Sequence, residues 1–128
     1  MVLNTLNAYV QLKRRLEVPE ILAELGLPVQ SRAIYRKLVD FMVYLNQGRF
    51  KVVELSQDHV DAFVKGKTGE YRVYINLRTG EFSCGCPHHK FRKALCKHVL
   101  LVLELYIFLT KDRSKVVEFL WKNLNYLK

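Results

Sequence analysis

The sequence predicts an α+β protein, because the spacing of its apolar residues changes twice along the chain. The spacing is close to helical in residues 2–45, has a period of two in residues 50–77, and becomes helical again from residue 99 onward. Half of the 128 residues are apolar, which is enough to form a hydrophobic core. We therefore expect N-terminal helices, a small antiparallel sheet, and helices at the C-terminal end.

Three helices are expected in the N-terminal part. The first covers residues 2–15 and ends in a basic run, which suits a helix C-terminus. The second is short, has Pro19 in its first turn and closes at Gly26. The third begins at the candidate N-cap Ser31 and ends near Gly48.

The second and third helices resemble a helix-turn-helix, in which the third helix would read DNA. Its basic residues Arg32, Arg36 and Lys37 lie off the apolar stripe. The turn is about two residues longer than the common pattern, since Ile34 lies far from Gly26. The alternative is a helical pair that covers the sheet and presents a solvated basic face.

Three strands and a short fourth one follow. They are predicted around residues 50–55, 60–64, 71–77 and 81–84, with turn sequences at residues 57–58, 66–69 and 78–80. Because these connectors have hairpin length, the sheet should be antiparallel. His59 is interpreted as an ordinary residue at the start of a strand.

Two further helices are expected after the strands. Residues 99–109 are strongly apolar, with Glu104 as the main polar position. This stretch is shorter than the roughly 20 residues that cross a bilayer, so we interpret it as a buried helix. Residues 114–127 predict an amphipathic helix around Trp121.

The chain is basic, with 21 Lys and Arg against 12 Asp and Glu and a formal net charge of +9. No acidic residue lies between Glu81 and Glu104, whereas Lys90, Arg92, Lys93 and Lys97 fall in that interval. This arrangement favours a polyanionic partner, although the basic residues could instead offset nearby thiolates. The N-terminus shows no secretory signal pattern, so we expect an intracellular protein, cytoplasmic or nucleoid/nuclear, without a membrane segment.

All three cysteines belong to two short motifs, Cys84-Gly85-Cys86 and Cys96-Lys97-His98. Three thiols and an imidazole are a complete tetrahedral ligand set for one structural Zn²⁺, with no position left for water. In a strand, residues two apart point to the same side, so Cys84 and Cys86 can reach one ion if Gly85 lets the backbone bend.

The second motif must span the start of a helix. Residues two apart in a helix are about 200° around its axis and cannot share a metal. We therefore expect Cys96 at the helix entry and His98 in the first turn, where the helix N-terminus favours the Cys96 thiolate.

Other interpretations of these residues are open. A disulfide is possible but leaves one cysteine over, and a catalytic thiol with His98 as base lacks an evident third group. Unliganded buried cysteines are a further alternative. His88 or His89 could replace one of the four ligands, although both are more simply surface residues of the loop between the motifs.

The two motifs, in their context, resemble the SWIM-type zinc finger. The resemblance lies in residues 71–77 (YRVYINL), 82–87 (FSCGCP) and 95–102 (LCKHVLLV). It implies a ββα zinc finger in which Cys84, Cys86, Cys96 and His98 bind the metal. We accordingly divide the chain into an N-terminal helical segment (1–48), a SWIM-type domain (49–110) and a helix packed on that domain (111–128).

The resemblance also implies a binding module. Members occur in chromatin-remodelling ATPases, transposases, signalling kinases and recombination-mediator proteins, where the module is thought to contact DNA or proteins. This chain shows no Gly-rich phosphate loop, paired catalytic carboxylates or nucleophile elbow, so we expect neither an enzyme nor a small-molecule substrate.

Two functional hypotheses follow. The first is nucleic-acid binding, DNA more than RNA, by an accessory factor. Its phosphate contacts would be Lys90, Arg92, Lys93 and Lys97, and possible further contacts are Arg32, Arg36 and Lys37. The second is a protein-interaction adaptor, such as a recombinase accessory subunit in DNA recombination or repair. Its apolar surface would include Tyr106, Phe119 and Trp121.

Overall fold

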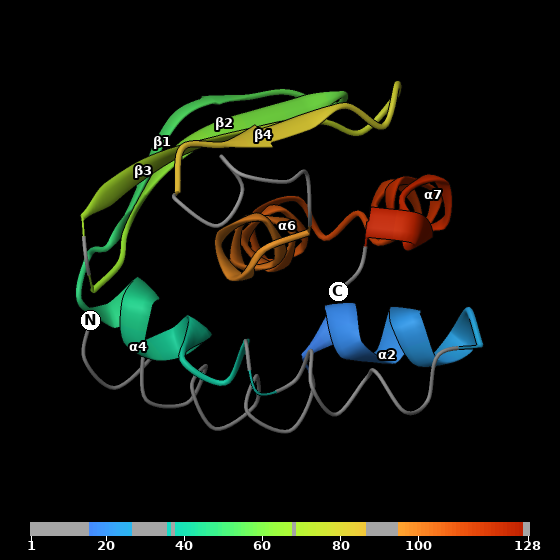
Figure 1. Cartoon of the computed structure of the whole chain (residues 1–128), viewed down its shortest axis with the longest axis horizontal. Coiled ribbons are helices and arrows are strands. Elements are labelled where there is room, and N and C mark those ends of the chain that lie inside the picture. Colours follow the sequence, from blue (N-terminus) through green and yellow to red (C-terminus); the bar gives the residue numbers. More distant parts are fainter. Residues whose placement is uncertain (1–15, 27–35, 37, 68, 87–94, 127–128) are drawn as a thin grey trace.

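The computed structural model describes residues 16–26, 36, 38–67, 69–86 and 95–126 of the chain. They form an α+β arrangement in which a buried helix lies between a curved sheet and two short helices (Figure 1). The buried helix is α6 (Lys97–Thr110), and the two short helices are α2 (Glu17–Glu24) and α4 (Phe41–Asn46). The predicted fold class is confirmed.

The sheet is a four-stranded antiparallel meander in the order β1-β2-β3-β4. Its strands are β1 (Phe50–Leu55), β2 (His59–Lys65), β3 (Glu70–Asn76) and β4 (Phe82–Cys84). The alternating side chains Val60, Ala62, Val64, Val73 and Ile75 are fully buried on the face that covers α6. All four predicted strands are therefore present, and His59 does begin β2.

Strand β1 forms one edge of the sheet and is more exposed than its neighbours. A bulge interrupts its pairing with β2 between Val52 and Glu54. Val53 is 51% exposed, while Leu55 is 39% exposed. A bulged edge strand is a poor template for pairing with a further strand.

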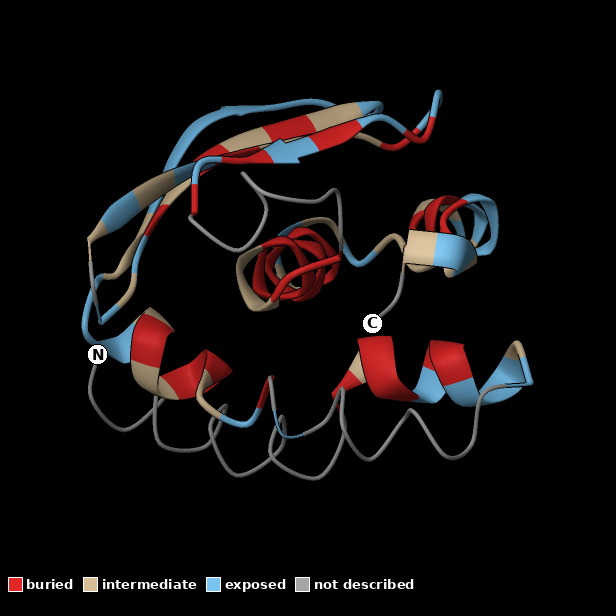
Figure 2. Cartoon of the chain, in the orientation of Figure 1, coloured by how far each residue is buried: buried red, intermediate tan, exposed pale blue. Residues whose placement is uncertain are grey.

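Helix α6 is the centre of the core. Every residue from Val99 to Ile107 is buried, including Glu104 (Figure 2). The helix contacts β2, β3 and β4 on one side and α2 on another. A helix that is apolar all round must be covered all round, as the sequence predicts.

The N-terminal predictions are confirmed in part. Helix α2 is followed by Gly26 at φ +90°, a conformation that favours glycine. The predicted third helix is interrupted by a turn at Val39 and Asp40, after which α4 runs from Phe41 to Asn46. The predicted first helix lies outside the described residues, as do Ser31 and the part of the proposed helix-turn-helix at residues 27–35 and 37.

The last helix is shorter than predicted. Helix α7 (Ser114–Lys122) stops at Asn123, and a 3₁₀ turn follows at Leu124–Tyr126. The buried Asn123 side chain donates to the carbonyl oxygens of Gly80 and Phe119, both at 2.9 Å. The Asn123 side chain thus occupies the carbonyl oxygen of Phe119 in α7 and links the end of this helix to the β3–β4 turn.

The apolar surface predicted on the last two helices is largely wrong. Tyr106 and Phe119 are 1% and 0% exposed and belong to the core, because both face the sheet side of the molecule. Trp121 alone of the three is exposed, at 64%. In the part of the chain that the structure describes, no helix is long and apolar enough to cross a membrane.

Candidate metal centre

Cys84 and Cys86 are placed by the end of β4. Cys84 is the last residue of that strand and pairs with Val73 of β3. The ladder continues one residue further, since the Gly85 N–H donates to the Arg72 carbonyl oxygen at 3.0 Å. Cys86 follows at a bend, and both cysteine side chains are buried.

The role predicted for Gly85 is wrong. Gly85 does not lie at positive φ, and a Cβ built there would meet nothing nearer than the Arg72 backbone nitrogen at 3.8 Å. That distance is an ordinary van der Waals contact. Neither the backbone conformation nor the space at this position therefore requires glycine.

Cys96 and His98 lie where the sequence predicts. Cys96 is the N-cap of α6 in an extended conformation, and His98 is in the first turn. The entry to the helix is fixed from the C-terminal end of the chain, because the Leu95 N–H donates to the Tyr126 carbonyl oxygen at 2.9 Å. The change from extended to helical backbone lets both side chains face the same point.

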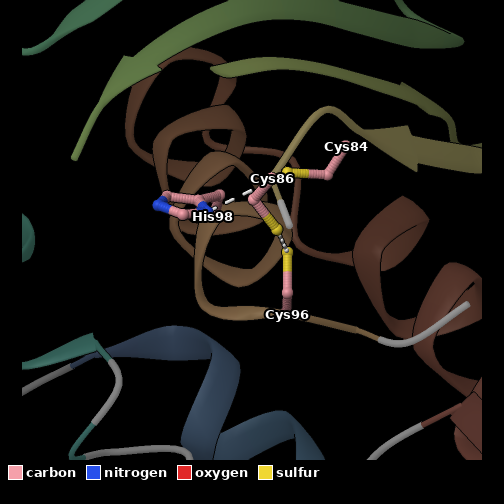
Figure 3. A group of neighbouring side chains, drawn as sticks. All are labelled: Cys84, Cys86, Cys96 and His98. Atoms are coloured by element: carbon pink, nitrogen blue, oxygen red, sulfur yellow. Dashed lines mark hydrogen bonds between the residues drawn. The ribbon is translucent and has the colours of Figure 1, made fainter. Parts of the chain in front are cut away.

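The four side chains converge on one point between β4 and the start of α6 (Figure 3). Their ligand atoms all lie within 4.8 Å of one another. The Sγ atoms of Cys86 and Cys96 are 3.7 Å apart, and Cys84 Sγ is 3.9 Å from His98 Nδ1.

These distances suit a tetrahedral zinc ion and not a disulfide. Zn–S bonds of about 2.3 Å and Zn–N bonds of about 2.0 Å give ligand separations of roughly 3.5–3.8 Å, whereas bonded sulfurs are about 2.05 Å apart. None of the three cysteines forms a disulfide bond. With three thiols and one imidazole the set is complete, so the cluster fits a single structural zinc ion.

The thiols interact strongly with one another. The pKa of the Cys96 thiol is lowered to about 3, first by the hydrogen bond from Cys84 and then by His98 and the backbone N–H of Val99. The pKa of Cys84 is raised, because it donates that hydrogen bond and is buried. The Val99 contribution has the direction predicted for a thiol at a helix N-terminus.

Sequence reasoning missed Gly66, in the turn between β2 and β3. A Cβ built on Gly66 would lie 3.0 Å from His98 Nε2, which is tighter than nine in ten real Cβ contacts. The Tyr71 ring lies 5.1 Å from the His98 ring, centroid to centroid. The β2–β3 turn therefore packs against the edge of the His98 ring that faces away from Cys84. Because the turn and His98 are far apart in the sequence, no local pattern indicates this contact.

The predicted nucleic-acid contacts are described only in part. Lys97 is half-buried, and its Nζ lies 3.5 Å from Asp40 Oδ2. Arg36 is helical and exposed. Arg32, Lys37, Lys90, Arg92 and Lys93 lie outside the described residues, as do His88 and His89.

A closed Cys₃His centre that joins the end of a sheet to a buried helix defines a structural zinc-binding module. Comparison with models of protein families indicates which kind of zinc-binding module this is. Residues 71–107 match the family model of the SWIM zinc finger, and this part of the chain is a SWIM zinc finger. The match contains all four cluster residues, as the sequence predicts. Neither a curated protein nor a solved structure matches the chain.

Proposed function

We propose that this protein is a non-enzymatic SWIM-type module that binds nucleic acid, DNA in preference to RNA, as an intracellular accessory factor. The zinc ion would have a structural role and would hold the binding surface in shape. The basic residues of the segment between the two ligand motifs would contact phosphates.

The distribution of charge along the chain carries this proposal. The described residues contain all 12 acidic residues of the chain but only 12 of its 21 Lys and Arg, so their formal net charge is zero. The whole excess of +9 therefore belongs to the remaining segments, which contain no Asp or Glu. Segments with one sign of charge suit a polyanion.

The metal centre links this charge to the fold. Lys90, Arg92 and Lys93 belong to the segment that joins Cys86 to Cys96. Zinc bound by these two cysteines would fix both ends of that segment. Loss of the metal should therefore weaken nucleic-acid binding although every basic side chain is retained.

A salt titration tests the proposal. Fluorescence anisotropy would measure affinity for labelled duplex DNA, single-stranded DNA and RNA over a range of salt concentrations. The logarithm of the affinity should fall linearly with the logarithm of salt, and the slope should decrease by about 0.9 for each duplex phosphate contact removed in K90Q/R92Q/K93Q. Weak binding that responds to neither salt nor these substitutions would reject nucleic-acid binding.

The adaptor hypothesis rests on a smaller surface than the sequence suggests. With Tyr106 and Phe119 in the core, the exposed aromatic side chain of Trp121 is what supports it. Interface centres are enriched in tryptophan, but a single exposed ring is common on monomeric proteins. We therefore place nucleic-acid binding first.

A further inference from the structure

Four basic residues from different elements lie near one another at the end of the fold where α6 begins. Lys97 is the first residue of α6, and its Nζ lies 5.2 Å from the centre of the Tyr44 ring of α4. The Arg49 guanidinium lies over the same ring at 4.7 Å. Tyr44 is buried, and both cations contact its ring.

Arg49 in turn is joined to the β2–β3 hairpin. Its carbonyl oxygen accepts a hydrogen bond of 2.9 Å from the Lys65 N–H, at the end of β2. Lys67 follows in the turn, and both lysine side chains are exposed. Figure 1 shows α4 and this turn at the same end of the sheet.

The chain of contacts closes at the metal centre. Gly66, between the two lysines, packs against His98 Nε2, and His98 is the neighbour of Lys97 in α6. Arg49, Lys65, Lys67 and Lys97 thus lie at the same end of the sheet as the ligand His98. We name these four residues the basic ring.

Two acidic residues lie beside the basic ring, and neither cancels it. Asp40 Oδ2 is 3.5 Å from the Lys97 ammonium, a long contact in a partly exposed pair, which contributes little. Glu70 opposes Lys65 in the β2–β3 register. The formal charge of this surface is therefore +2, in a described fold whose formal net charge is zero. The acid-free segment with Lys90, Arg92 and Lys93 leads directly into Lys97.

We propose that the basic ring is a second phosphate-contacting surface for nucleic acid, besides the segment between the zinc ligands that precedes Lys97 in sequence. This inference rests on the proposed function and adds Arg49, Lys65 and Lys67 as contacts. The contacts would be made to phosphates and would carry no sequence preference, because the donors are cationic side chains at the end of a hairpin. Zinc at His98 would hold the ring by supporting the hairpin.

The test compares three triple variants of the full chain, each with bound zinc and an unchanged circular dichroism spectrum. R49Q/K65Q/K67Q removes charge from the ring, and R49K/K65R/K67R preserves it. R78Q/K111Q/K122Q removes the same charge from the opposite end of the sheet and of α6. The probes are short DNA of mixed sequence, duplex and single-stranded, titrated over a range of salt concentrations.

We expect R49Q/K65Q/K67Q to lose about tenfold or more in affinity at fixed salt and to show a smaller salt slope. The other two triple variants should bind like the wild type. If R49Q/K65Q/K67Q and R78Q/K111Q/K122Q lose affinity equally, the basic ring is not a specific contact surface, whereas the proposal of nucleic-acid binding is retained. If the wild type itself shows no salt-dependent binding, the proposed function fails first. Should the ring variant lose zinc, the single variants K65Q and K67Q replace it.

Discussion

Glu104, in the middle of α6, caps the N-terminus of α2. Its Oε1 accepts a hydrogen bond from the Val18 N–H, and its Oε2 accepts one from the Glu17 N–H, both at 3.1 Å. The N-cap residue Leu16 supplies no side-chain cap of its own. A carboxylate that is 86 residues away in sequence therefore satisfies the first free backbone donors of the helix.

Burial raises the pKa of Glu104 to about 7, against a lowering by the Val18 and Glu17 N–H groups. The nearby acidic residues Glu17 and Glu20 of α2 raise the pKa of Glu104 further. Arg113 pairs with Glu17 and Glu24, which both belong to α2. A raised carboxyl pKa means that the folded state binds more protons than the unfolded state. The Glu104 contribution to stability should therefore be largest at low pH and decrease as pH rises from 4.5 to 7.

Substitution E104Q should remove this pH dependence. The free energy of unfolding of the wild type, relative to E104Q, should fall by roughly 3 kcal/mol through that interval. Denaturant unfolding at several pH values measures it, and acid release of zinc cancels in the comparison because both proteins share the site. E118Q, at an exposed position of α7, is the control. A constant difference between wild type and E104Q would contradict the assignment.

The metal centre predicts that folding depends on zinc. Purified protein should contain one zinc ion per chain, and C84S should lose both the ion and the cooperative unfolding transition, because the four ligands join β4 to α6. Elemental analysis and circular dichroism measure the two effects. S83A, at the exposed neighbouring position, should retain both. A folded C84S protein without metal would rule out a structural zinc site.

The two glycines near the site should respond differently to alanine. In G66A the new methyl group would press on His98 Nε2, so zinc affinity should fall by roughly tenfold. In G85A the methyl group would make only ordinary van der Waals contacts, so the affinity for zinc should stay unchanged. Competition with a chromophoric chelator compares the two. Equal affinities would show that the β2–β3 turn does not constrain the histidine.

Two aromatic residues of α7 should contribute very differently to stability, because one lies in the core and the other on the surface. F119A removes a fully buried ring that contacts Phe82 and should cost about 3–5 kcal/mol. W121A removes a ring that is 64% exposed and should change stability by less than about 0.5 kcal/mol. Thermal unfolding of both variants measures this. A large loss in W121A would mean that its ring is covered in solution, as an interface would require.

Local patterns predict the secondary structure well where one rule dominates. The period of two between residues 50 and 77 predicts β1 to β3, and the Cys96-Lys97-His98 spacing predicts a helix start, because two ligands can share an ion only there. The predictions fail where distant contacts compete. Asn123 ends α7 early because its side chain bonds to the carbonyl oxygen of Gly80, in another part of the chain.

Gly85 and Gly66, near the metal centre, show the same difference between local patterns and distant contacts. Gly85 stands between two ligands, and proximity in sequence suggested a geometric role that its φ and its surroundings do not require. Gly66 has that role, since it packs against His98, but no pattern within the β2–β3 turn refers to a residue 32 positions later.

The sequence by itself determined the α+β class, the strands, the buried helix and the four side chains of the metal centre. It could do so because periodicity and ligand spacing are local properties of the chain. Only the tertiary structure decided that Glu104 caps α2, that Phe119 is core while Trp121 is surface, and that the four residues of the basic ring lie at the same end of the sheet. These relationships join residues from different elements, and the packing of the sheet and helices around α6 brings them together.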